Sequence, residues 1–303
     1  MNATLTPVVL DGGLATELEA RGHDLSDRLW SARLLLTDPA AIEDVHLAYY
    51  RAGAQVATTA SYQATVPGFL AAGLDRQAAT DAIKRSAVLA RRARERYAAE
   101  GDRTVTGLLV AGSVGPYGAM LADGSEYRGD YDPGPSALRE IHAPRIEALL
   151  EAGVDLLAME TIPTIREAEV LVTLLDMFAA TGWLSYQCRD GATTAAGEPI
   201  EDAMRVAHGH VGVVAVGVNC TAPRHVPAIL TAARSATDLP LIAYPNGGDR
   251  WDATMRGWVA DDEAGRFAGP EIGAWTGLGA AWLGGCCGTG PSDIAGLAQA
   301  LAT

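Results

Sequence analysis

Short apolar segments, each about as long as a β-strand, alternate with segments of helical character along nearly the whole chain. Eight such segments are bounded by glycine, proline or polar residues, at 8–13, 55–62, 105–114, 155–162, 183–188, 213–220, 241–246 and 280–285. Several are apolar almost throughout, which is typical of strands buried on both faces of a parallel sheet. The helices that we expect between them lie at 38–52, 75–100, 136–152, 165–181, 198–208, 224–236, 262–276 and 291–302.

This alternation predicts an α/β fold, a single (β/α)8 barrel of the TIM type that forms one domain over residues 1–303. A doubly wound open sheet is the alternative. However, no Gly-x-Gly-x-x-Gly sequence opens a helix after the first apolar segment, and no internal repeat or proline-rich linker divides the chain. We expect the long connection at 117–135 to form a loop over the active face of the barrel.

Charge and hydropathy exclude several classes of partner. The chain carries 37 acidic against 23 basic residues and a formal net charge of −14, which makes nucleic acid an unsuitable partner. No apolar stretch reaches the roughly 18 to 20 residues that span a bilayer, and the N-terminus lacks the pattern of a signal peptide. We therefore expect a cytoplasmic protein without membrane contact, and we expect a monomer or a small homo-oligomer.

Two carboxylates follow apolar segments at the strand ends, where the chemistry of such a barrel is concentrated. Asp11 ends the first of these strands and Glu160 lies near the end of the fourth. Charge at the end of a buried strand is costly without a partner. We expect both side chains to recognise the ammonium group of an amino-acid substrate, and a buried ion pair or a backbone-capping role is the alternative.

Aromatic residues also gather at the strand ends or just beyond them. Tyr62, Tyr117, Tyr244 and Trp251 would together form a wall for a cationic donor through cation–π attraction. Any one of them taken alone is more simply explained by packing.

All four cysteines occupy strand ends. Cys220 ends the sixth apolar segment, and Cys286 and Cys287 follow the eighth in the glycine-rich run 284–290. Three thiolates delivered from two strand ends suit zinc and leave one coordination position open, as in catalytic rather than structural zinc sites. Cys188 is either a fourth ligand or a core cysteine, and we favour the core because a fourth ligand would close the site.

Other interpretations of the glycine-rich run remain open. The cysteine pair would also suit a packed barrel corner, a vicinal disulfide, or a non-catalytic zinc or redox-sensing barrel with four ligands. Glycines before a helix are typical of phosphate loops as well, although such a loop has no use for two thiols. A Schiff-base lyase or aldolase is disfavoured because Lys84, the single lysine, lies in a predicted helix.

Seven motifs of the zinc-dependent homocysteine S-methyltransferases occur in the expected order, so that the chain resembles this family nearly from end to end. They are Asp11-Gly12-Gly13-Leu14-Ala15-Thr16-Glu17-Leu18-Glu19, Ser61-Tyr62-Gln63-Ala64, Ala111-Gly112-Ser113-Val114-Gly115-Pro116-Tyr117-Gly118-Ala119, Glu160-Thr161-Ile162-Pro163, Asn219-Cys220-Thr221, Tyr244-Pro245-Asn246 and Gly284-Gly285-Cys286-Cys287. The second and sixth motifs resemble the branch that uses S-methylmethionine or S-adenosylmethionine rather than betaine.

The resemblance implies that Cys220, Cys286 and Cys287 bind Zn²⁺ and that the sulfur of homocysteine takes the open position. No catalytic residue is then expected beyond the bound substrate thiolate. One position departs from the family pattern, since Gly288 stands where an arginine usually follows the cysteine pair. The departure bears on substrate carboxylate binding and on the charge balance around the thiolates.

The resemblance also implies a set of substrate contacts. Asp11 and Glu160 would hold the amino group of homocysteine, and Tyr62 would face the methyl donor. We place Gly12, Asn219 and Asn246 in the substrate site as well. The expected reaction transfers a methyl group from a sulfonium donor to homocysteine and forms methionine. A betaine-dependent enzyme, or a methyltransferase for another thiol or a selenol, is the alternative within this chemistry.

Overall fold

An eight-stranded parallel sheet forms the centre of the computed structural model, which describes residues 7–26, 29–101, 104–252, 257–260 and 269–302. The strands follow one another in the order β1 (Val8–Val9), β10 (Ala280–Leu283), β7 (Leu241–Tyr244), β6 (Val213–Asn219), β5 (Gly182–Tyr186), β4 (Leu156–Ile162), β3 (Leu109–Val114) and β2 (Val56–Thr58). A parallel bridge between Leu10 and Val56 joins the two outermost strands and closes the sheet. The predicted (β/α)8 barrel is therefore confirmed.

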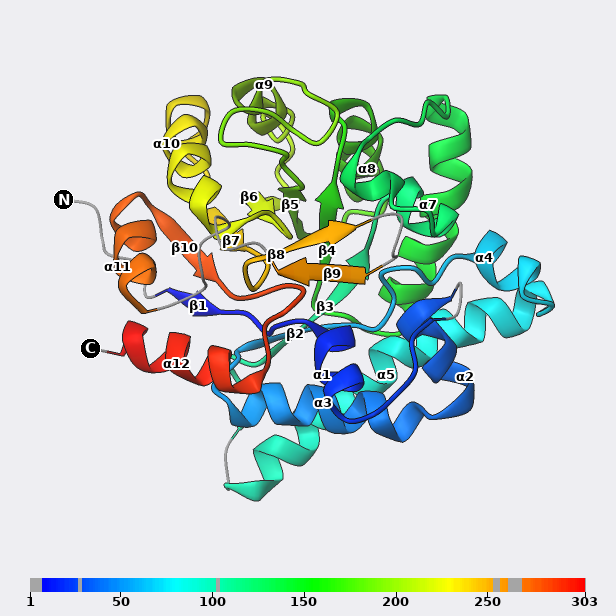
Figure 1. Cartoon of the computed structure of the whole chain (residues 1–303). Coiled ribbons are helices and arrows are strands. Elements are labelled where there is room, and N and C mark those ends of the chain that lie inside the picture. The colour runs from blue at the N-terminus through cyan, green and yellow to red at the C-terminus, as the bar shows by residue number, and fades with distance from the viewer. Residues whose placement is uncertain (1–6, 27–28, 102–103, 253–256, 261–268, 303) are drawn as a thin grey trace.

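Helices surround the barrel on its outside (Figure 1). The α-helices are α1 (Leu14–Ala20), α2 (Leu34–Thr37), α3 (Pro39–Arg51), α4 (Val66–Ala71), α5 (Arg76–Glu100), α6 (Tyr117–Leu121), α7 (Pro135–Glu151), α8 (Ile165–Met177), α9 (Ile200–Arg205), α10 (Val226–Ala236), α11 (Gly269–Gly277) and α12 (Pro291–Leu301). Local sequence sets their starts: at α3, the Asp38 carboxylate accepts from the Ala41 N–H at 3.2 Å, and Pro39 takes the first position. Among the described residues, no helix has the length and apolarity needed to cross a bilayer.

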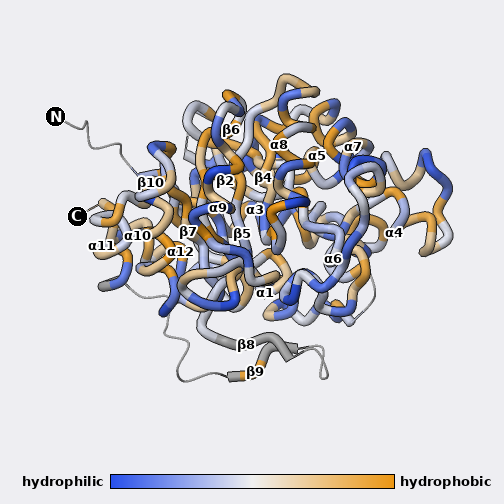
Figure 2. The backbone as a smooth tube through the Cα atoms, turned by 90° about the horizontal axis from the view of Figure 1, so that it is seen from above, coloured by the Kyte–Doolittle hydropathy of each residue, from blue (hydrophilic) through white to orange (hydrophobic). Residues whose placement is uncertain are grey.

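Alternating strand residues separate two apolar layers. On β4, Leu157 and Met159 pack into the large cluster between sheet and helices, whereas Leu156 and Ala158 belong to the smaller cluster inside the barrel. Hydrophobic stretches accordingly run through the strands, and hydrophilic stretches lie mainly at the periphery (Figure 2). The next residue in the inward series of β4 is Glu160, so the interior changes from apolar to polar at the carboxyl ends of the strands.

Three segments differ from the expectations. The connection at 117–135 is not a plain loop, since it contains α6 and the 3-10 turn η2 (Ser125–Tyr127). An antiparallel hairpin of β8 (Asp249–Asp252) and β9 (Gly257–Ala260), which sequence analysis did not foresee, lies between β7 and α11. The part of the predicted helix 262–276 that the structure describes begins at Gly269, because 261–268 lie outside the described residues.

Candidate metal and substrate site

Three thiols from two strand ends meet at the top of the barrel. Cys220 follows β6, Cys286 and Cys287 follow β10, and their sulfur atoms all lie within 4.8 Å of one another. A tetrahedral zinc ion with bonds of about 2.3 Å places its sulfur ligands roughly 3.8 Å apart, so the group fits a metal ion with little movement. Cys188 packs in the main hydrophobic cluster, apart from this group, and burial raises the pKa of its thiol.

Strand β7, which lies between β6 and β10, and Pro245 directly after it hold the thiols together through their backbone carbonyls. The Cys220 N–H donates to Tyr244 O at 3.1 Å, and the Cys286 N–H donates to Pro245 O at 2.8 Å. Hydrogen bonds from its two neighbours hold the pKa of Cys220 well below that of a free thiol, whereas contact with Cys220 raises the pKa values of Cys286 and Cys287. The three thiols are therefore electrostatically coupled, and the low pKa of Cys220 suits it to bind a metal ion as a thiolate.

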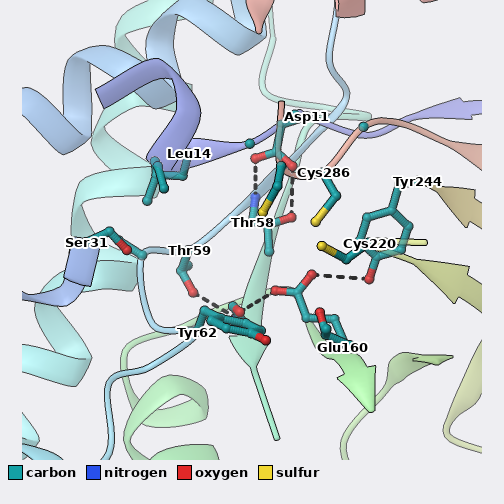
Figure 3. A pocket seen from close by; sticks show the side chains of 18 of the residues that line it. Asp11, Leu14, Ser31, Thr58, Thr59, Tyr62, Glu160, Cys220, Tyr244 and Cys286 are labelled. Carbon is teal, nitrogen blue, oxygen red and sulfur yellow. Dashed lines mark hydrogen bonds between the residues drawn. The ribbon is translucent and has the colours of Figure 1, made fainter. Parts of the chain in front are cut away.

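Two buried carboxylates flank the thiols (Figure 3). Asp11 accepts from the Thr58 N–H at 2.7 Å and from Thr58 Oγ1 at 2.9 Å. Glu160 accepts from the hydroxyl groups of Ser113 and Tyr244, the latter at 3.2 Å. Burial raises the pKa of each carboxyl group to about 8, and the nearby Cys286 adds to the shift at Glu160.

No cationic side chain balances these groups within the described part of the pocket. The residues that line it include Asp11, Glu160 and the three cysteines but no lysine, arginine or histidine. The alternative of a buried ion pair for the two carboxylates is therefore not what the structure shows. A pocket with this many acidic groups and no internal cation is suited to cationic ligands, such as a metal ion and an ammonium or sulfonium group.

Two aromatic residues, Trp30 and Tyr62, border the same pocket. The rings of Trp30 and Tyr62 meet edge to face with centroids 6.1 Å apart, and the Tyr62 hydroxyl is buried without a hydrogen bond among the described residues. Of the other expected aromatic residues, Tyr244 lines the pocket, whereas Tyr117 packs against Tyr131 with centroids 5.3 Å apart. The Trp251 side chain lies outside the described residues.

Backbone strain concentrates around the pocket. Trp30, Thr161 and Cys220 have φ values of 50°, 59° and 47°, and each of them lines the pocket. Left-handed backbone is rare for side chains of this kind and is retained where surrounding structure enforces it, often at functional sites. A metal-ligand candidate, Cys220, and an aromatic lining residue, Trp30, are thus both held in strained backbone at the pocket.

The remaining expected substrate residues occupy different positions. Gly12 lines the pocket, and a Cβ atom there would lie 2.8 Å from Thr289 O. Asn219 is fully buried: its amide oxygen accepts from the Thr161 N–H at 2.6 Å, and its amide nitrogen lies 3.9 Å from the Cys286 sulfur. Asn246 accepts from the Gly248 N–H at 3.0 Å and lies outside the described pocket lining.

Sequence reasoning missed several residues of the pocket. Trp30 and Ser31 come from the 3-10 turn η1 (Trp30–Arg33), in a stretch without any periodic signal. Tyr127 belongs to η2, and its hydroxyl lies 3.9 Å from the Cys220 sulfur. A hydroxyl that reaches a sulfur about 90 positions further along the chain leaves no local trace in the sequence.

Gly288, which departs from the family pattern, occupies a left-handed turn with φ 79°. Its N–H donates to Thr16 Oγ1 at 2.8 Å, and a Cβ atom there would lie 3.3 Å from the backbone of Gly247. Glycine adopts this conformation without steric cost. The turn directly after the cysteine pair is thus relaxed in this chain and presents no side chain to the pocket.

Comparisons with known proteins point in one direction. The family model described as homocysteine S-methyltransferase matches residues 8–301. The homocysteine S-methyltransferase of Escherichia coli is 50% identical over 291 residues, which are 96% of this chain and 94% of that protein. The selenocysteine Se-methyltransferase of Brassica oleracea is 40% identical over 299 residues, which are 94% of this chain and 86% of that protein.

A solved structure is also similar. The metallated form of the homocysteine methyltransferase MmuM from Escherichia coli superimposes with a TM-score of 0.88 at 47% identity. The superposition covers 97% of this chain and 96% of that one.

Proposed function

The chain belongs to the homocysteine S-methyltransferase family, and we propose that it transfers a methyl group from a sulfonium donor to homocysteine. The donor is S-methylmethionine or S-adenosylmethionine, and the methylated product is methionine. We further propose that residues 1–303 act as one homocysteine-binding barrel domain, as a monomer or a small homo-oligomer, because one chain supplies all the described lining of the pocket.

One observation carries this proposal: three thiols within 4.8 Å of one another share a pocket with two buried carboxylates and no described cationic side chain. Each part of that arrangement matches one requirement of the reaction. The thiols suit a metal ion, the carboxylates suit the ammonium group of an amino acid, and the absence of cations suits a positively charged donor.

Cys220, Cys286 and Cys287 are the residues that would hold the metal, and an all-sulfur donor set favours zinc among the common divalent ions. When bound, zinc supplies a Lewis acid that keeps a coordinated thiol deprotonated near neutral pH. The similar Escherichia coli protein has been solved in a metallated form, which supports metal binding by this chain as well. Asn219 lies behind Cys286 and would orient it rather than contact substrate.

Asp11 and Glu160 would bind the ammonium group of homocysteine. Both are held in place before substrate arrives: Thr58 donates to Asp11, and Ser113 and Tyr244 donate to Glu160. A cation brought between them would lower both carboxyl pKa values from about 8 and restore the ionised forms. Gly12, directly after Asp11, packs so closely on Tyr49 and Thr289 that a Cβ atom would lie 2.9 and 2.8 Å from them, and this packing would hold the Asp11 segment beside the substrate.

Tyr62 and Trp30, whose rings meet edge to face, would receive the sulfonium group of the donor against a ring face, where the aromatic quadrupole is negative. In the reaction the homocysteine sulfur attacks the methyl carbon in line with the departing donor sulfur. A new S–CH₃ bond forms, the old one breaks, and its electron pair stays on the donor sulfur, which becomes neutral. These residues supply orientation and exclude water. Asn246 accepts from the Gly248 N–H, and the N–H of Gly247 between them donates to Cys287 O at 2.7 Å, so Asn246 would stabilise the wall of the site.

A donor panel on zinc-loaded protein tests the proposal. S-methylmethionine, S-adenosylmethionine and betaine are each offered with homocysteine, and methionine is quantified by mass spectrometry. We expect product with at least one of the two sulfonium donors and at most traces with betaine. Protein that binds no zinc, or that prefers betaine, would refute the proposal.

A selenol acceptor is a second candidate, favoured by the 40% identity to a selenocysteine Se-methyltransferase. Selenium is a soft donor like sulfur, so the same metal centre would accept it. The same panel with selenocysteine as acceptor decides between the two, through the ratio of kcat/KM for selenocysteine to that for homocysteine.

A further inference from the structure

A cluster of three charged or titratable side chains is buried beside the pocket without lining it. Glu167 on α8 and His142 and Arg145 on α7 are all fully buried. Desolvating an arginine and a glutamate together is costly unless their hydrogen bonds are satisfied. Their positions therefore require an explanation beyond packing.

Glu167 binds three separate segments through its two carboxylate oxygens. Oε1 accepts from the Tyr117 N–H at 2.6 Å and from His142 Nε2 at 2.7 Å. Oε2 accepts from the Tyr131 hydroxyl at 2.6 Å. One carboxylate thus fixes the start of α6, the approach to α7 and the imidazole of His142.

Arg145 donates to the other side of the same imidazole and to two loop carbonyls. Its Nη2 donates to His142 Nδ1 at 2.7 Å and to Gly115 O at 2.5 Å, and its Nη1 donates to Tyr62 O at 2.9 Å. A guanidinium group can only donate, so Nδ1 is the acceptor and the proton of the neutral ring is on Nε2, facing Glu167. Both hydrogen bonds of this series therefore have a fixed direction: Arg145 donates to His142, and His142 donates to Glu167.

The two carbonyls that Arg145 holds determine where the Tyr62 ring lies. A Cβ atom at Gly115 would lie 2.6 Å from the Tyr62 ring and from Tyr62 O, so the ring packs directly on this glycine. Tyr62 and Gly115 follow β2 and β3, respectively, and the guanidinium group donates to the backbone carbonyls of both. One residue earlier, the Ser61 hydroxyl donates to Ser113 O at 2.7 Å, so that this bond joins the strand ends and Arg145 fixes the positions just beyond them. A shift of Arg145 would therefore move the Tyr62 ring relative to the three thiols.

We propose that Arg145, oriented by His142 and Glu167, is a positioning residue for the methyl donor, because it holds Tyr62 and Gly115 in one fixed arrangement. The inference rests on the proposed function, in which Tyr62 receives the donor. Homocysteine contacts a different wall, formed by Asp11, Glu160 and the cysteines. Disturbing Arg145 should therefore weaken donor binding and leave homocysteine binding nearly unchanged.

Arg145→Lys is the decisive variant. The charge of Arg145 also acts on Glu160, so a neutral replacement would disturb both substrates. Lysine keeps the charge but loses the planar fork that bonds two carbonyls and an imidazole at once. We expect the donor KM to rise about tenfold, equivalent to about 1.4 kcal/mol, while the homocysteine KM stays within about twofold.

Arg91→Lys is the matched control. Arg91 also donates to a backbone carbonyl, Ala152 O at 3.0 Å, but at the opposite end of the barrel. This variant should lower thermal stability without changing either KM. Equal changes in the two KM values for Arg145→Lys, or no change, would overturn the inference. A wild-type enzyme without methyl transfer from any sulfonium donor would instead overturn the proposed function, and the inference with it.

Tyr131→Phe provides the same test if Arg145→Lys is not recovered in folded form. It removes one hydrogen bond from Glu167 and leaves all charges in place. We expect a selective rise in donor KM of about threefold, the effect of one weakened hydrogen bond. An unchanged donor KM in this folded variant would overturn the inference.

Discussion

Both ends of the barrel carry charged groups, but the two ends use them differently. At the end opposite the pocket, Arg94 forms an ion pair with Asp155 at 2.7 Å and the His210 ring is hydrogen-bonded to Asp176 at 2.6 Å, and these side chains are partly exposed. At the pocket end, Asp11 is buried without a described cationic partner. Paired surface charges stabilise a fold slightly, whereas a buried carboxyl group without a cation lowers stability, even when burial raises its pKa and keeps it protonated, and it is retained for function.

The backbone shows the same contrast. Five non-glycine residues of the described chain have positive φ, and three of them, Trp30, Thr161 and Cys220, line the pocket. The pocket end therefore combines backbone strain with buried acidic groups that have no described cation in the pocket. Substitutions there should reduce function more than stability, and substitutions at the opposite end should do the reverse.

The largest expected effect comes from Cys286→Ala. With one of three thiolates removed, metal content should fall sharply and kcat/KM should drop more than about a thousandfold. Removing a residue that only hydrogen-bonds to a metal ligand typically costs about 10–100-fold, so the loss of a ligand itself should exceed that range. Metal analysis and methionine formation are the measurements. Cys188→Ala is the control, because Cys188 lies in the hydrophobic cluster and should leave metal content intact. Retained activity in Cys286→Ala would contradict the assignment.

Glu160→Gln should separate function from stability most clearly. Loss of the negative charge should raise the homocysteine KM at least about 30-fold, or about 2 kcal/mol, as expected for one partner of a buried charged contact. The free energy of unfolding, measured in urea near pH 7, should stay equal or increase, because Gln removes a buried acid whose ionisation in the unfolded chain opposes folding. A less stable protein with an unchanged KM would contradict the contrast between the two ends.

Tyr127→Phe should have a smaller effect. Its hydroxyl lies 3.9 Å from the Cys220 sulfur, where it offsets charge on that ligand and restrains it. We expect kcat to fall by about threefold, in line with a weak hydrogen bond to sulfur, and metal content to remain unchanged. Loss of metal in this variant would contradict this expectation, because it would show that the tyrosine contributes to metal binding and not to the methyl transfer itself.

Arg94→Ala should leave activity almost untouched. Arg94 bonds Asp155 and Leu108 O at the opposite end of the barrel. The free energy of unfolding should fall by about 1 kcal/mol, the upper range for a partly exposed ion pair. Equilibrium denaturation and a kcat/KM measurement on the same preparation test this, and a large loss of activity would break the proposed division between the two ends.

Much of the fold was predictable because its signals are local. Apolar strand segments, Pro39 after Asp38, and glycines after the eighth strand each act within a few residues. The hairpin of β8 and β9 was missed because its short segments resemble loop sequence. The turn η2 was missed for a related reason, since a single 3-10 turn has no periodicity to detect.

The sequence by itself determined the barrel, the family and the three thiols, because strand periodicity and residue type are properties of the chain before it folds. Only the tertiary structure decided that Tyr127 approaches Cys220, that Trp30 meets Tyr62, and that Arg145 holds Tyr62 and Gly115. Each of these contacts joins segments that are distant along the chain. Their partners are selected by barrel closure and by packing of the loops above it, which no local pattern encodes.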